Sequence, residues 1–169
     1  MDRLASARHL AGRFFGSLST RPPVPADENW ARSQLRPGED AMWVQLSNPD
    51  RRHAIGVARD VVARLGADAT RPVVAAALLH DSGKLASGFG TFARVGATVW
   101  AVAIGRERAA TGGGRLARYL RHDAIGADAL AAAGADPLTV AWTREHHLDP
   151  SAWTVERRLA DALKAADDD

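Results

Sequence analysis

Apolar residues recur along most of this chain at intervals of three and four positions, and no strand-length window keeps a steady alternation of apolar and polar residues. An α-helix turns once every 3.6 residues, so this spacing gathers the apolar side chains on one buried face of each helix. The pattern therefore predicts an all-α fold in which no strand is needed. A length of 169 residues fits one domain with a hydrophobic core of its own.

Proline and glycine divide the early part of the chain. We expect residues 1–48 to form a helical extension that packs on a core domain of residues 49–169. The elements expected in the extension are a helix over about 3–17, a proline-containing linker over 21–25, a helix from Asp27, and another, after the Pro37-Gly38 break, toward Leu46. The core domain should open with a helix that has Asn48 as its cap and Pro49 in its first turn, and that ends at Gly66.

The most apolar helix is expected to begin at Pro72. Its first part, from Val73 to Leu79, contains only apolar residues, which predicts a helix buried on every side. The pair His80-Asp81 follows, and Gly83 stops the helix. Polar groups without partners are costly in a protein interior, so His80 and Asp81 require a partner there.

Three further helices are expected near the C-terminus, over 122–133, 137–147 and from 155 to the end. Before them lies 95–105, the longest stretch without a charged residue. A membrane span needs about 20 apolar residues. We therefore expect no transmembrane segment and take 95–105 as a core helix, with peripheral membrane contact as the alternative. Residues 1–17 lack the unbroken apolar core of a secretory signal, which favours a cytoplasmic protein.

Composition narrows the candidate chemistry. The chain has no cysteine, which excludes thiolate nucleophiles and thiolate metal sites and leaves imidazole and carboxylate as the metal ligands. Its 22 basic residues are nearly balanced by 20 acidic ones, for a formal net charge of +2. Nucleic acid is therefore an unlikely partner.

Histidines mark the candidate site. Five of the six histidines lie on expected helices or at their ends, and only His9 is isolated. Each of the five alone could be a buried imidazole with satisfied hydrogen bonds. Together with the neighbouring aspartates they favour a divalent cation, since the negative end of a helix also attracts one. The five are His53, His80, His122, His146 and His147.

One string of residues carries a resemblance to a known family. Residues 75–84 read AAALLHDSGK and closely resemble the AALLHDxGK signature of the HD-domain metal-dependent phosphohydrolases. Some members of this family bind two metals, and the further motifs typical of those members occur here in the same order along the chain. The resemblance extends from about residue 50 to the end. These motifs are His53, His122, the pair His146-His147 and a late aspartate. The resemblance implies a helical bundle of the HD-domain type.

The resemblance also implies the ligands of a binuclear centre. Asp81 would bridge two divalent ions drawn from Mn, Fe, Co, Ni or Mg and act in catalysis. One ion would be completed by His53, His80 and Asp167, and the other by His122, His146 and His147. The choice of Asp167 leaves Asp161, Asp168 and Asp169 as alternatives.

Basic residues are candidates for phosphate binding. Lys84, one of two lysines, would neutralise the transferring phosphate and act in both catalysis and substrate binding. Arginines flank the glycines at 112–114, and of these we expect Arg115 and Arg118 to bind substrate, with a solvated basic face as the alternative. Asp123 and Glu145, adjacent to the expected ligands, are candidates for orienting the histidines.

These expectations converge on a metal-dependent phosphohydrolase, a phosphomonoesterase or phosphodiesterase that uses a metal-bridging hydroxide. Its substrate would be a nucleotide or a similar phosphorylated small molecule. No GYP motif follows Lys84, so cyclic di-GMP hydrolysis of the HD-GYP kind is not supported. The alternative is a non-catalytic helical regulatory module that binds a nucleotide or protein partner and holds a structural metal.

Overall fold

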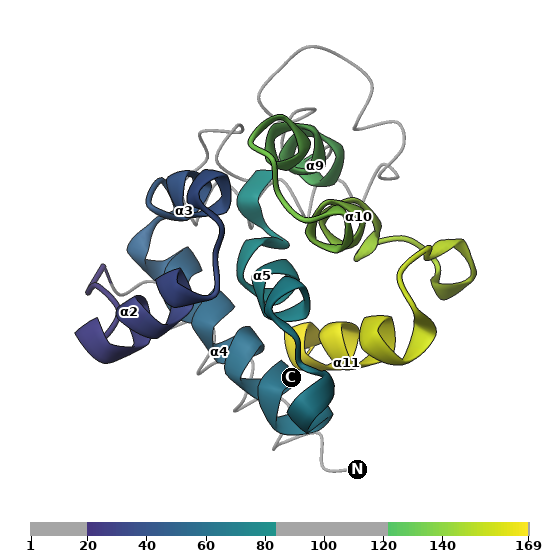
Figure 1. Ribbon diagram of the computed structural model, residues 1–169, viewed down its shortest axis with the longest axis horizontal. Coiled ribbons are helices and arrows are strands. Elements are labelled where there is room, and N and C mark those ends of the chain that lie inside the picture. The colour runs from purple at the N-terminus through teal and green to yellow at the C-terminus, as the bar shows by residue number, and fades with distance from the viewer. Residues whose placement is uncertain (1–19, 84–121, 169) are drawn as a thin grey trace, which may run out of the picture.

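A computed structural model describes residues 20–83 and 122–168 of the chain (Figure 1). Every regular element within these two ranges is a helix, which confirms the all-α prediction for the described part. The helix expected over 3–17, the apolar stretch 95–105 and the glycines at 112–114 lie outside the described residues.

Two short helices, α2 (Pro25–Ser33) and α3 (Pro37–Trp43), precede the expected core domain. Each begins at a proline, whose fixed φ suits the first helical turn and whose missing N–H leaves no donor unsatisfied there. Pro37 and Gly38 therefore lie inside α3, and the break that we expected at them falls earlier, at residues 34–36. The buried carboxylate of Glu39 accepts hydrogen bonds from Arg36 N at 2.8 Å and Asp136 N at 3.1 Å, which joins α3 to the turn before α10.

Helix α4 (Asn48–Leu65) is longer and presents Ala54, Val57 and Val61 to the core. Its cap is Ser47, whose hydroxyl accepts from Asp50 N at 3.3 Å, so the expectation of Asn48 as the cap is wrong by one residue. The helix ends at Gly66, as predicted, where a φ of 56° favours glycine. A short 3₁₀ turn, η1 (Gly66–Asp68), leads to the next helix.

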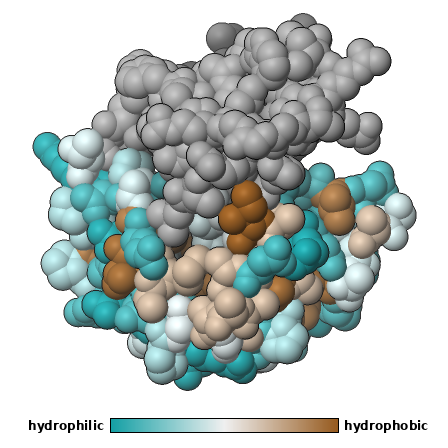
Figure 2. All heavy atoms as spheres, turned by 90° about the horizontal axis from the view of Figure 1, so that it is seen from above, coloured by the Kyte–Doolittle hydropathy of each residue, from teal (hydrophilic) through white to brown (hydrophobic). Residues whose placement is uncertain are grey.

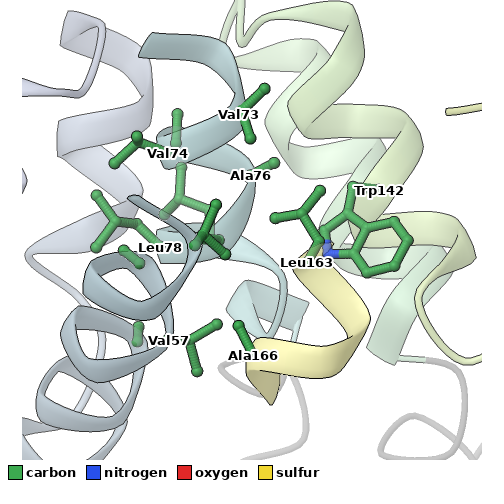
Figure 3. Packing of buried hydrophobic residues seen from close by; sticks show 14 of the residues in the cluster. Val57, Val73, Val74, Ala76, Leu78, Trp142, Leu163 and Ala166 are labelled. Carbon is green, nitrogen blue, oxygen red and sulfur yellow. The ribbon is translucent and has the colours of Figure 1, made fainter. Parts of the chain in front are cut away.

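Helix α5 (Arg71–Leu79) lies at the centre of the described fold, in contact with α3, α4 and α10 (Figure 1). Every side chain from Val73 to Leu79 is buried, which confirms that α5 is enclosed on all sides. Figure 3 shows Trp142 of α10 and Leu163 of α11 beside it. The residue that follows Leu79, His80, therefore lies in the protein interior.

Helices α9 (His122–Ala132) and α10 (Pro137–Glu145) are joined by a tight turn in which Gly134 has a φ of 75°. Asp128 and Arg144 form an ion pair of 2.7 Å across the two helices. The 3₁₀ turn η3 (Pro150–Ala152) then leads to α11 (Arg157–Asp168), which packs on α4. α5, α9 and α10 end earlier than the sequence predicted, at Leu79, Ala132 and Glu145, so Gly83 does not stop α5, and α11 begins at Arg157, two residues later than predicted.

No helix in the described ranges combines the length and the apolarity that a membrane crossing requires. The large apolar side chains that are exposed there are Val24, Val44 and Leu148. On the face that Figure 2 shows, hydrophilic residues border the hydrophobic ones.

A close backbone approach gives a test of this packing. A Cβ atom on Gly126 of α9 would lie 2.6 Å from Gly83 N and 2.9 Å from Gly83 Cα, so Gly126→Ala must displace backbone. We expect Gly126→Ala to lower the free energy of unfolding by about 1–3 kcal/mol, measured by urea denaturation. The control is Gly56→Ala in α4, where nothing lies within 4 Å of the new methyl group and where alanine should stabilise by up to about 1 kcal/mol. Equal stabilities of the two variants would contradict the described approach of α9 to residue 83.

Candidate metal centre

His80 occupies the position at which α5 ends. The ring is 2% exposed, and its Nδ1 lies 2.9 Å from the carbonyl oxygen of Ala77, one turn back on the same helix. Its Nε2 is buried and makes no hydrogen bond to any described residue. The nearest charged atoms to it are Asp167 Oδ1 at 3.4 Å and Asp81 Oδ2 at 3.5 Å, both longer than an ordinary hydrogen bond.

His146 repeats this arrangement at the end of α10. It is the residue that follows Glu145, is 1% exposed, and places Nδ1 3.1 Å from the carbonyl oxygen of Thr143. The ring centroids of His80 and His146 are 5.3 Å apart, with the rings nearly perpendicular. In both residues a carbonyl oxygen accepts a hydrogen bond from Nδ1–H, which directs Nε2 toward the same region.

The first group of donors consists of His53, His80 and Asp167, whose ligand atoms all lie within 4.8 Å of one another. α4 contributes His53 and α11 contributes Asp167, so residues more than a hundred positions apart meet at the end of α5. His53 Nε2 lies 3.2 Å from Asp167 Oδ1. With a side chain that is 35% exposed, His53 forms the open edge of this group.

The second group consists of Asp81, His146 and His147, again within 4.8 Å of one another. Asp81 stands between the groups, since its Oδ2 is 3.5 Å from His80 Nε2 and its Oδ1 is 3.9 Å from His146 Nε2. One carboxylate thus faces a histidine of each group with a different oxygen. His147, 31% exposed, forms the open edge of the second group.

The late aspartates differ in their partners. Asp161 pairs with Arg157 at 2.8 Å, and Asp168 pairs with Lys164, each one turn away on α11. Asp167 instead faces His53 and His80. Among the described late aspartates, Asp167 is therefore the one that the fold brings to the histidines, and Asp169 lies outside the described residues.

Several expected site residues cannot be placed against these groups. His122 begins α9, but its side chain lies outside the description. Lys84, Arg115 and Arg118 also fall outside the described residues, as do the other arginines that flank the glycines at 112–114. Their expected roles as ligand, catalytic group and substrate-binding residues stay predictions.

The two carboxylates proposed to orient histidines behave differently. Asp123 Oδ1 lies 3.8 Å from His146 Nε2 and 4.0 Å from His147 Nε2. The expectation for Glu145 is wrong, because its carboxylate accepts hydrogen bonds from Thr154 N at 2.7 Å and Thr154 Oγ1 at 2.5 Å. Glu145 thus ties the end of α10 to the segment before α11.

Burial and charge shift the pKa values of the cluster in opposite directions. Burial alone would lower the pKa of His80, but the carboxylates of Asp81 and Asp167 outweigh it and raise that pKa to about 10. For Asp167, burial is outweighed by His53 and His80, which hold its pKa well below the usual range. Burial and the nearby His80 lower the pKa of His146 to about 3, so this imidazole is neutral. A cation that binds at the first group must therefore displace a proton from His80.

The residues present fit a divalent cation. The two groups offer imidazole nitrogen and carboxylate oxygen, the donors that divalent first-row metals such as Mn, Fe, Co and Ni accept in proteins. The buried Nε2 of His80 makes no hydrogen bond within the described residues, and a bound ion would satisfy it. Residues that could hold such ions are His53, His80, Asp81, His146, His147 and Asp167.

Comparison with known proteins gives no match to a family model, to a curated protein or to a solved structure. The description of this centre therefore depends on the residues and distances given above.

A pair of variants on α11 tests the first group. Asp167→Asn removes the carboxylate that faces His53 and His80, and we expect it to weaken divalent-cation binding by roughly tenfold or more, measured by calorimetry on metal-stripped protein. Asp161→Asn, which alters an exposed ion pair on the same helix, is the matched control and should bind as the wild type does. Identical affinities of the two variants would exclude Asp167 as a ligand.

Proposed function

We propose that this chain is a metal-dependent phosphohydrolase that cleaves a phosphate ester or anhydride in a nucleotide or a similar phosphorylated small molecule. The observation that carries the proposal is the position of Asp81, which directs one oxygen toward His80 and the other toward His146. A carboxylate between two groups of donors suits a pair of cations. The likeness of residues 75–84 to the HD-domain signature supplies the reaction class.

When bound, two divalent cations would supply Lewis acidity and lower the pKa of a water molecule into the neutral range. The contribution of the chain is to hold its donors in place beforehand. His80 and His146 are buried and each is bonded through Nδ1 to its own helix, so neither ring needs to reorient to offer Nε2. Such fixed donors avoid the reorganisation that a flexible site would require during the reaction.

The exposure of the histidines indicates the side from which a substrate enters. His80 and His146 are closed off, whereas His53 and His147 each retain about a third of their exposure. A phosphate group would therefore reach the centre past His53 and His147. In this proposal Lys84, next in the chain after Gly83, neutralises the phosphate charge, and Arg115 and Arg118 bind the rest of the substrate.

Water is the best-supported nucleophile. Ser82 and Thr143 are the hydroxyl residues beside the described donors, and both are buried. Thr143 Oγ1 also lies 3.4 Å from the carbonyl oxygen of Leu79 and faces α5. The chain has no cysteine. A direct attack by water on phosphorus therefore fits these residues better than a covalent intermediate does.

The proposal is tested on metal-loaded full-length protein with nucleoside phosphates, dinucleotides and cyclic dinucleotides, by chromatography of the products. We expect at least one substrate to be hydrolysed, with ¹⁸O from labelled water in the phosphate product. Asp81→Asn should reduce turnover by about a hundredfold or more, because it removes the carboxylate between the groups. Asp161→Asn should leave turnover unchanged.

Background turnover that is equal in the wild type and in Asp81→Asn would remove the enzyme claim. If metal stripping then unfolded the protein, the regulatory module with a structural metal would be the better account.

A further inference from the structure

Asp123 lies where the first turn of α9 meets the end of α10. The two helices run in opposite directions, since the turn between them is short and Asp128 pairs with Arg144 at 2.7 Å. Asp123 lies more than one turn before Asp128 on α9, and His146 and His147 follow Arg144 at the end of α10. The antiparallel packing therefore brings Asp123 close to these two histidines. Figure 1 shows the two helices packed together.

Asp123 stands outside the two groups of donors that all lie within 4.8 Å of one another, and its distances to His146 and His147 are those of donors that share an ion. Its Oδ1 atom is buried and lies 3.8 Å from His146 Nε2 and 4.0 Å from His147 Nε2. Both separations are too long for a hydrogen bond to either ring. Metal–ligand bonds of about 2.0–2.2 Å place neighbouring donors on one ion roughly 3–4 Å apart.

Charge favours the same assignment. Asp81 Oδ1 approaches His146 Nε2 at 3.9 Å, so two carboxylates face one buried imidazole. Two carboxylates that converge on one buried imidazole make a negative environment that attracts a cation. Asp81, Asp123 and Asp167 together would nearly balance two divalent cations. The buried Nε2 of His80, which makes no hydrogen bond to a described residue, independently indicates that the cluster takes a ligand.

We infer that Asp123 is a direct ligand of the cation held by Asp81, His146 and His147, an inference that rests on the metal centre of the proposed function. The second site then has four described donors, with oxygen from Asp123 of α9 and from Asp81 just after α5, and nitrogen from the end of α10. Asp123 supplies this oxygen whether or not the neighbouring His122 also binds.

The test is a Co²⁺ titration of metal-stripped full-length protein, followed by calorimetry and by visible absorption. We expect Asp123→Asn to bind one equivalent as the wild type does and the other roughly tenfold or more weakly. The absorption of the weakened equivalent should change, because the ion loses an oxygen ligand. The matched control is Asp128→Asn on the same helix, which should keep both equivalents and both spectra.

Two results would overturn the inference. One is an Asp123→Asn protein with wild-type affinities and absorption for both equivalents. The other is a folded variant that binds neither equivalent, since Asp123 would then support the whole cluster instead of one ion. Near-ultraviolet circular dichroism of Trp142 and Trp153, which pack against each other at 5.5 Å, reports folding.

A second variant keeps the test decisive if Asp123→Asn does not fold. Asp123→Glu retains the carboxylate on a longer side chain, so two equivalents should bind and the absorption of one should shift. An unshifted spectrum would overturn the inference. A selective loss of one equivalent without any phosphohydrolase activity in the wild type would leave the assignment of Asp123 standing while the proposed reaction fails. Hydrolysis by the wild type together with normal metal binding by Asp123→Asn would support the proposed reaction and overturn the assignment of Asp123.

Discussion

An imidazole that follows seven consecutive buried apolar residues has to satisfy its polar atoms inside the protein. His80 is in this position at the end of α5. Its Nδ1 donates a hydrogen bond to the helix itself, and its Nε2 faces Asp81 and Asp167 without a hydrogen bond to any residue that the structure describes. α4 and α11, which pack on each other, bring His53 and Asp167 to this point. The helices that pack around α5 therefore also bring the charged groups of the cluster to His80.

The histidines at the ends of α5 and α10 are held by the same local hydrogen bond. In each, the ring folds back on its own helix and Nδ1–H donates a hydrogen bond to the carbonyl oxygen three residues earlier. Both Nε2 atoms then face Asp81, which turns Oδ2 toward His80 and Oδ1 toward His146. Each donor group therefore has one buried histidine, His80 or His146, and one partly exposed histidine, His53 or His147. The exposed pair forms the side of the centre that solvent can reach.

The sequence alone predicted the parts of the fold that an unbroken apolar run or a single glycine determines. The unbroken apolar run before His80 predicted the enclosure of α5, and Gly66 predicted the end of α4. Finer features depend on side-chain direction, which neighbours in sequence do not determine because adjacent helical residues point about 100° apart. Glu145 precedes His146 and yet bonds to Thr154, and Ser47 takes the capping role expected of Asn48. The hydrogen bond from Asp136 N to Glu39 joins residues 97 positions apart and leaves no local signal in the sequence.

Anomalous diffraction from crystals grown with Mn²⁺ tests the account most directly, because it locates ions without reference to activity. The account predicts two anomalous peaks, one bordered by His53, His80 and Asp167 and the other by His146 and His147, with Asp81 between them. Crystals that show these side chains in place but no peak at either group would contradict it.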